Sequence, residues 1–260
     1  MTCATAPAFW APQQRLPLPL QRFVRVRLEA ALDHPTQRAL LVWPTVLGAP
    51  KLREAYPEGI PEEVLFQQAG PMLAALGIAE PRSAWQETLR DHPDTADRGL
   101  RGWVPQRIWN PLDAQISLRC GVILLALTAQ PEDDRYRLSV AVTLFNSALF
   151  HECHDALESL WSQASGDLKK GLQGLILLTA GFYHQQRMDA GGMMSLWRDG
   201  LKALKALDAF EGEVATPWGR VEVAASLANV EARLAWLREL DSEAPLDGLW
   251  ELPRPEWTLK

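Results

Sequence analysis

The chain has 260 residues, of which 47% are hydrophobic and 22% are charged, a composition typical of a globular protein long enough to bury a sizeable core. The formal net charge of -6 excludes an overall basic surface for nucleic acid or an anionic membrane, so we expect neither as a partner. The three cysteines, Cys3, Cys120 and Cys153, form no CxxC motif, which argues against a disulfide framework or a thiolate zinc site and favours the cytoplasm.

The N-terminal residues 1–20 contain four prolines and no basic segment followed by an apolar core. We therefore expect a loose arm here rather than a targeting signal. The longest apolar runs of the chain, Gly121–Ala129 and Leu172–Tyr183, are shorter than the roughly 20 residues that a membrane-spanning helix needs. Both runs are therefore predicted to be core helices.

Prolines punctuate residues 21–103, which limits any helix there to a short one. Residues 24–28 alternate between apolar and charged side chains, which leaves a short strand and a helix both open. Glu62–Leu76, with a bend at Pro71, and Ser83–Leu89 are typical of helices. The sequence predicts short helices for this N-terminal region, but it does not predict their arrangement or the type of domain.

Start and stop signals become clear over residues 104–243 and predict a helical bundle. The predicted helices cover about residues 111–129, 131–164, 168–187 and 190–207, followed by a last helix from Thr216. The link at Gly166 is so short that the second and third helices should form an antiparallel hairpin. Residues 244–260 should pack as an irregular strap. The sequence thus predicts an all-α fold, an antiparallel helical bundle built on a helix hairpin, with a less regular, mainly helical N-terminal region.

The segment FNSALFHECHDALESLW, Phe145 to Trp161, concentrates the polar chemistry of the chain. One stripe of the predicted helix, about 100° wide, holds His151, His154, Asp155 and Glu158. Apolar residues flank this stripe, so the helix has one mixed and one core face. Glu152 lies away from the other carboxylates on the helix and needs a different partner.

Folding the hairpin about its loop brings residues of the next helix opposite this motif. Gln173 is expected opposite Glu158, Ala180 opposite His151, and His184 near Asn146. Glycines at 171, 174 and 181 are unfavourable inside a helix by about 1 kcal/mol each, so neighbouring elements should approach closely at these positions.

These motifs resemble a bacterial and archaeal family catalogued as domain of unknown function 309. The matching residues are Asn146, Phe150, Glu152, His154, Asp155, Glu158, Trp161, Gln173, Gly174, Leu175, Ile176 and His184. Asp155 stands where glutamate is usual in the family. The resemblance covers about residues 140–207 and implies a small all-helical fold, but no known reaction.

Two interpretations of the cluster remain open, one chemical and one structural. In the chemical one, a divalent transition metal or an acid/base reaction uses imidazole and carboxylate groups from two helices. The candidate ligands are His151, His154, Asp155, Glu158 and His184.

In the structural interpretation, which the residues alone favour, the polar groups form a buried network that fixes which helices pair. Its members are Asn146, Glu152, His154, Asp155, Glu158, Gln173 and His184. The domain would then be a binding or scaffolding module. A small molecule, a protein or a second copy of the chain is open as its partner, and whether the protein is an enzyme is not predicted.

Overall fold

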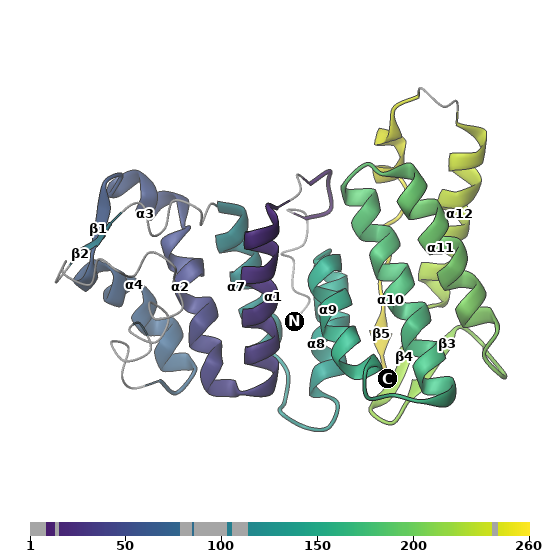
Figure 1. The fold of residues 1–260 in the computed structure, drawn as a ribbon, viewed down its shortest axis with the longest axis horizontal. Coiled ribbons are helices and arrows are strands. Elements are labelled where there is room, and N and C mark those ends of the chain that lie inside the picture. The colour runs from purple at the N-terminus through teal and green to yellow at the C-terminus, as the bar shows by residue number, and fades with distance from the viewer. Residues whose placement is uncertain (1–8, 14–15, 79–84, 86–102, 106–113, 241–243) are drawn as a thin grey trace. The chain divides into compact units, whose positions relative to one another are not determined.

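The computed structural model describes residues 9–13, 16–78, 85, 103–105, 114–240 and 244–260. The chain is predominantly helical, which confirms the predicted fold class (Figure 1). It divides into two compact units, residues 17–129, and residues 130–260 together with the N-terminal segment up to Leu16. Among the described helices, none combines the length and apolarity that crossing a lipid bilayer requires.

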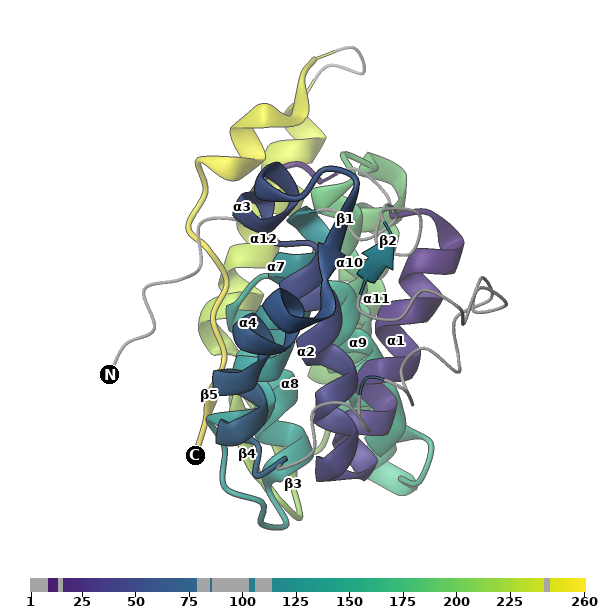
Figure 2. The same cartoon turned by 90° about the vertical axis from the view of Figure 1, so that its left-hand side faces the viewer.

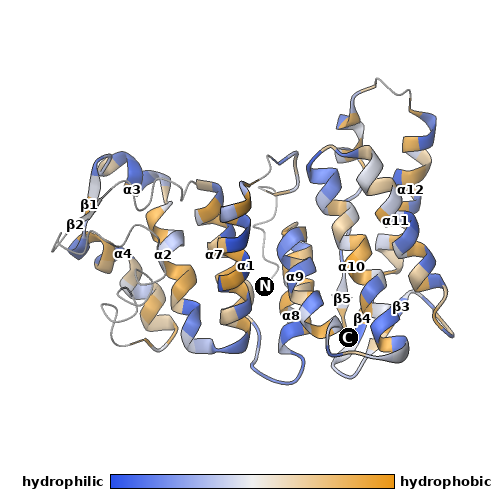
Figure 3. Cartoon of the chain, viewed as in Figure 1, coloured by the Kyte–Doolittle hydropathy of each residue, from blue (hydrophilic) through white to orange (hydrophobic). Residues whose placement is uncertain are grey.

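The unit of residues 17–129 is built around one apolar helix. Its elements are α1 (Leu18–Asp33), η1 (Pro35–Arg38), α2 (Ala39–Leu47), α3 (Pro50–Ala55), β1 (Gly59–Pro61), α4 (Glu62–Ala75), β2 (Trp103–Pro105) and α7 (Ala114–Thr128). Helix α2 contacts α1, α4 and α7 (Figure 2). The Trp43 side chain of α2 is fully buried. Hydrophobic residues run along most of α7 and over α2 (Figure 3). The buried side chains of α2 therefore lie at the centre of the hydrophobic core of this unit.

Several predictions fall within this unit. Residues 24–28 belong to the helix α1, not to a strand, and the helix predicted from Glu62 is α4, with Pro71 inside it. The helix predicted at 83–89 lies outside the described residues, apart from Trp85. Helix α7 packs against α2, so it belongs to this unit, whereas the sequence grouped it with the later helices.

The second unit contains the central motif. Its elements are α8 (Tyr136–Asn146), α9 (Phe150–Trp161), α10 (Gly166–Gln186), α11 (Ala190–Lys205), β3 (Glu213–Thr216), β4 (Gly219–Glu222), α12 (Ala224–Glu239), η2 (Leu246–Trp250) and β5 (Thr258–Leu259). Helix α10 contacts both α9 and α11 (Figure 1). The three strands form an antiparallel sheet in the order β3-β4-β5, with Val221 paired to Val214 on one side and to Leu259 on the other.

Two predicted helices of this unit are wrong in extent. The helix predicted over residues 131–164 is divided into α8 and α9, because Ala148 has a left-handed backbone with φ of 56°. The last helix begins at Ala224 instead of Thr216, because Glu213 to Glu222 form a hairpin that turns at Pro217 and Trp218. The C-terminal segment is also more regular than predicted, since it contains η2 and β5.

The antiparallel hairpin predicted from the short link at Gly166 is formed by α9 and α10. The rings of Phe150 and Phe182 stack with centroids 5.3 Å apart, and the rings of His151 and Tyr183 meet edge to face at 5.1 Å. Tyr183 is three residues, about one helical turn, from the Ala180 expected opposite His151. The hairpin register is therefore within one turn of the prediction.

Close approach at the α10 glycines is confirmed. A Cβ atom at Gly171, Gly174 or Gly181 would lie 2.7 Å or less from a side-chain atom of Val214, Leu204 or Trp197, respectively. These neighbours belong to β3 and α11. The glycines therefore let α10 accept the side chains of the elements that follow it.

Candidate metal centre

Helix α9 is held in place by its apolar face. Phe150, Cys153 and Leu157 are buried where α9 contacts α8 and α10. Burial raises the pKa of the Cys153 thiol, so this sulfur stays protonated and is a poor metal ligand. The mixed face of the helix therefore carries the donors.

Asp155 lies at the centre of this face. It is 6% exposed, and its two carboxylate oxygens lie near two different histidines of the same helix. Oδ2 is 3.1 Å from Nδ1 of His151, and Oδ1 is 3.4 Å from Nδ1 of His154. The histidine side chains are 28% and 29% exposed. A buried carboxylate is thus flanked by two imidazoles that reach solvent.

The charge state of Asp155 follows from two opposing effects. Burial raises the pKa of its carboxyl group, but the polar contacts and charges of His151 and His154 lower it by more. The net result is a pKa below the ordinary value for aspartate. Asp155 is therefore ionised at neutral pH and can act as a ligand without first losing a proton.

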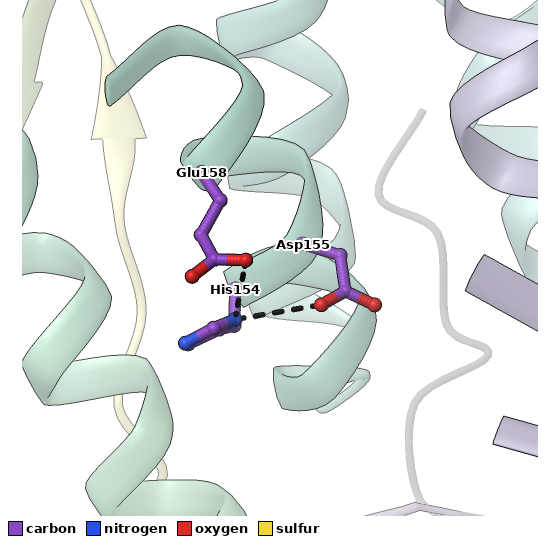
Figure 4. A group of neighbouring side chains, drawn as sticks. All are labelled: His154, Asp155 and Glu158. Carbon is purple, nitrogen blue, oxygen red and sulfur yellow. Dashed lines mark ion pairs between the residues drawn. The ribbon is translucent and has the colours of Figure 1, made fainter. Parts of the chain in front are cut away.

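Glu158 completes a group of three donors. Its Oε2 is 3.9 Å from Nδ1 of His154, and its side chain is 49% exposed. One donor atom each from His154, Asp155 and Glu158 lies within 4.8 Å of the others, and in Figure 4 both carboxylates face the same imidazole. Two ligands about 2.1 Å from one tetrahedral ion are roughly 3.4 Å apart. The carboxylate oxygens of Asp155 and Glu158 lie 3.4 and 3.9 Å from Nδ1 of His154, which is close to the distance between two ligands of one ion.

His184 is engaged elsewhere. Its Nδ1 lies 2.7 Å from Oδ2 of Asp189, whose Oδ1 accepts a hydrogen bond of 3.0 Å from the backbone N–H of Gly192. Asp189 is the N-cap of α11, and the Gly192 N–H together with His184 lowers the pKa of its carboxyl group. The structure thus places His184 at the α10–α11 junction, outside the group of three donors.

The remaining residues of the predicted network are also dispersed. Asn146 forms two hydrogen bonds with the backbone of Trp257 near the C-terminus. Glu152 is buried on α9, with 3% exposure, and Gln173 is half-buried on α10. The structure therefore brings together the residues of one helix face, but does not gather Asn146 and His184 around them.

A comparison with known protein families locates this motif. Residues 138–196 match the family model described as Domain of unknown function (DUF309). This segment therefore matches DUF309. The match confirms the resemblance predicted from the motif, and it covers only part of the chain. No curated protein gives a significant match, and no solved structure does.

Two glutamines of the DUF309 segment have structural roles that the sequence interpretation missed. Nε2 of Gln186 donates hydrogen bonds to the carbonyl oxygens of Phe9, at 2.7 Å, and Ala148, at 2.8 Å. Oε1 of Gln185 accepts a hydrogen bond of 3.0 Å from Nε of Arg233. Both glutamines are buried at the C-terminal end of α10, and no motif in the sequence marks them.

Arg233 of α12 lies outside the DUF309 segment and is fully buried. Its guanidinium donates to carbonyl oxygens of Asn229, Leu249, Leu252 and Pro253, and it lies 5.4 Å from the centroid of the Trp10 ring. Burial lowers its pKa to about 10, so it remains cationic at neutral pH. The signal for its burial was its position between Val230 and Leu234 on the apolar face of the helix.

Proposed function

We propose that His154, Asp155 and Glu158 bind a divalent transition metal. The observation that carries the proposal is the grouping of one imidazole nitrogen and two carboxylate oxygens within 4.8 Å on one helix face. An imidazole with carboxylates suits zinc, iron or manganese better than calcium or magnesium, which prefer all-oxygen shells.

The chemistry that such an ion supplies follows from the number of protein ligands. Three ligands leave at least one coordination position for water or substrate, as in catalytic rather than structural sites. When bound, the ion polarises a substrate oxygen or lowers the pKa of its water. Asp155 offers a negative charge from a buried position, and the exposed Glu158 lies toward solvent. The site thus supports metal-dependent catalysis.

The connections between elements support a functional role for this stripe. His151, His154, Asp155 and Glu158 are all on α9, so contacts among them do not join one helix to another. Hydrogen bonds that do join separate elements come from Asn146, Gln186 and Arg233. The His151 ring does meet Tyr183 of α10 edge to face, whereas the contacts that His154 makes with Asp155 and Glu158 stay inside α9 and do not serve this locking function.

The test is metal binding by the full chain after mild purification and removal of bound metal. We expect titration with Zn²⁺ or Mn²⁺ to give saturable binding, strongly weakened in His154→Ala and Glu158→Gln. The matched controls are His34→Ala and Glu239→Gln, which change exposed residues outside the group. Equal binding by the four variants, or no binding by the natural chain, would contradict the proposal.

A structural role is the second candidate, favoured by the burial of Asp155 and Glu152. In that case α9 belongs to a binding or scaffolding module, and the imidazoles serve to neutralise a buried carboxylate. His154→Ala would then lower the free energy of unfolding by about 1–3 kcal/mol in metal-free buffer, with no metal bound by either protein. Calorimetry and urea unfolding on the same samples distinguish the two candidates.

A further inference from the structure

Residues 9–13, which we call the N-terminal segment, are bound by residues far from them in the sequence. Phe9 is 2% exposed, and its carbonyl oxygen accepts a hydrogen bond of 2.7 Å from Nε2 of Gln186, the last residue of α10. The backbone N–H of Gln13 donates to the carbonyl oxygen of Gln186 at 2.6 Å. One residue of α10 therefore holds both ends of the segment through the backbone atoms of the segment.

The side chain of Trp10 lies among aromatic and cationic groups of the second unit. Its ring meets the rings of Trp250 and Phe150 edge to face, with centroids 5.0 Å and 6.3 Å apart. The guanidinium of Arg233 lies 5.4 Å from the centroid of the same ring. Both kinds of contact attract an aromatic side chain. Phe150, Gln186, Arg233 and Trp250 thus form one binding surface, which we call the acceptor surface.

The acceptor surface is separate from the stretch of chain that carries the N-terminal segment to it. All four of its residues lie within 130–260, whereas residues 17–129 form the other compact unit and stand between the segment and the surface in the sequence. The hydrogen bond from Gln186 to Phe9 spans 177 positions. The effective concentration that a tether provides falls as the tether lengthens, so an identical segment from another molecule can compete for the same contacts.

An acceptor surface without a segment would be unfavourable. Departure of the segment would remove the Trp10 ring, which lies against Phe150 and Arg233, and these residues are 1% and 0% exposed in the folded chain. It would also take from Gln186 one of the two carbonyl oxygens to which Nε2 donates, the other being that of Ala148. Buried polar groups require such partners. The surface is therefore occupied by the segment of its own chain or by one of the same chemistry.

We propose that the acceptor surface binds the N-terminal segment of a second copy of this chain. The ligand is a peptide with two adjacent aromatic side chains, Phe9 and Trp10, and a backbone N–H donor at Gln13. Reciprocal exchange gives a closed dimer, because each copy supplies one segment and one surface. Pro17 is the sole residue between the buried Leu16 and the first residue of α1, and short hinges favour such an exchange over a closed monomer. Binding of the segment does not require the metal.

The first test uses full-length chains and a fluorescein-labelled synthetic peptide of residues 7–16. Trp10→Ala weakens the segment of the chain itself, so we expect this variant to bind the peptide saturably and more tightly than the natural chain does. The peptide that carries Trp10→Ala should bind about tenfold more weakly. Absence of peptide binding by the Trp10→Ala chain would overturn the proposal.

Matched substitutions locate the binding of the peptide. Added to the Trp10→Ala chain, Trp250→Ala should abolish binding, and Trp250→Phe should restore part of it because phenylalanine retains a ring. Restoration separates loss of the contact from loss of folding. The control is Trp218→Ala in the same chain, which changes a half-buried tryptophan outside the acceptor surface and should leave binding intact. Equal binding by the Trp250→Ala and Trp218→Ala chains would overturn the proposal.

The second test measures the mass of the natural chain by light scattering over a range of protein concentrations. We expect a monomer–dimer equilibrium, with the dimer lost in Trp10→Ala alone and in Trp250→Ala alone. A mixture of these two variants should regain a dimer, since one copy supplies an intact segment and the other an intact surface. A natural chain that stays monomeric at every concentration overturns the proposal, because the segment then serves only its own chain. A dimer that neither substitution weakens uses another surface and overturns it as well.

Discussion

The side-chain amide of Asn146 pairs with the backbone of Trp257 as a neighbouring strand would. Nδ2 of Asn146 donates to the Trp257 carbonyl oxygen at 2.8 Å, and its Oδ1 accepts from the Trp257 N–H at 2.9 Å. The Trp257 ring stacks on Phe145 with centroids 3.7 Å apart and planes 5° apart. This pairing fixes the C-terminal segment to the end of α8, immediately before the break at Ala148 that allows α9 to begin.

Asn146→Ala should therefore release the C-terminal segment as well as destabilise the unit. Loss of one partner leaves the buried backbone groups of Trp257 without hydrogen bonds, so we expect the free energy of unfolding to fall by about 1–3 kcal/mol. Hydrogen exchange should show faster exchange of the Trp257 amide. Asn229→Ala is the control, because the side chain of this half-buried residue donates one solvent-exposed hydrogen bond, to Pro253. Equal protection of Trp257 in both variants would refute the pairing.

Arg233 is expected to be the most sensitive arginine of the second unit. Arg233→Met removes the donor shared by several carbonyl oxygens and by Gln185, and we expect a loss of about 2–4 kcal/mol of unfolding free energy. Methionine keeps much of the volume, so the loss reports the hydrogen bonds rather than a cavity. Arg238→Met, at an exposed position of the same helix, should change stability by less than about 0.5 kcal/mol. Thermal unfolding of both variants checks this difference.

Helices were predictable from the sequence where capping residues and short links mark the same boundaries that the folded structure has. The short link at Gly166 predicted the hairpin, and the helix predicted from residue 190 agrees with the observed start of α11. The break at Ala148 was not predictable, because alanine carries no turn signal and the left-handed conformation is stabilised by distant groups. Gln186 bonds the Ala148 carbonyl oxygen from another helix. Contacts of this kind are invisible in local periodicity.

Contacts among the polar side chains of one helix face were predictable from the sequence, whereas the contact that His184 makes on the facing helix was not. The spacing of His151, His154, Asp155 and Glu158 sufficed to place them together, since helical periodicity alone sets their separation. His184 was expected among them because it lies on the facing helix, yet the short loop after α10 provides Asp189 as a nearer partner. Local capping thus determined the contacts of this histidine.

Gly181 is expected to tolerate no larger residue. A Cβ atom there would lie 2.3 Å from the Trp197 ring, which is fully buried, so Gly181→Ala must displace the ring and should reduce the unfolding free energy by about 1–3 kcal/mol. At Gly191 the nearest atom would be 3.8 Å away, and Gly191→Ala should stabilise the helix by up to about 1 kcal/mol. Opposite signs for the two substitutions in urea unfolding are the expected outcome. A gain in stability for Gly181→Ala would show that Trp197 does not lie against this helix.

Asp155 should make stability depend on pH in a specific direction. Its pKa in the folded protein is below the ordinary value, so the ionised carboxylate stabilises the folded state above about pH 4. This contribution is lost as the pH falls through the ordinary value toward the lower pKa of the folded protein. Asp155→Asn should therefore reduce the unfolding free energy by about 1–3 kcal/mol at neutral pH in metal-free buffer, and the difference should shrink below about pH 4.

Urea unfolding of both proteins between neutral pH and about pH 3 measures this dependence. Asp199→Asn, a change at an exposed carboxylate of α11, should give a small difference at every pH. A difference for Asp155→Asn that stays constant down to about pH 3 would mean that the amide disturbs packing, not charge. No difference at neutral pH would show that His151 and His154 do not stabilise the ionised carboxylate in the folded protein.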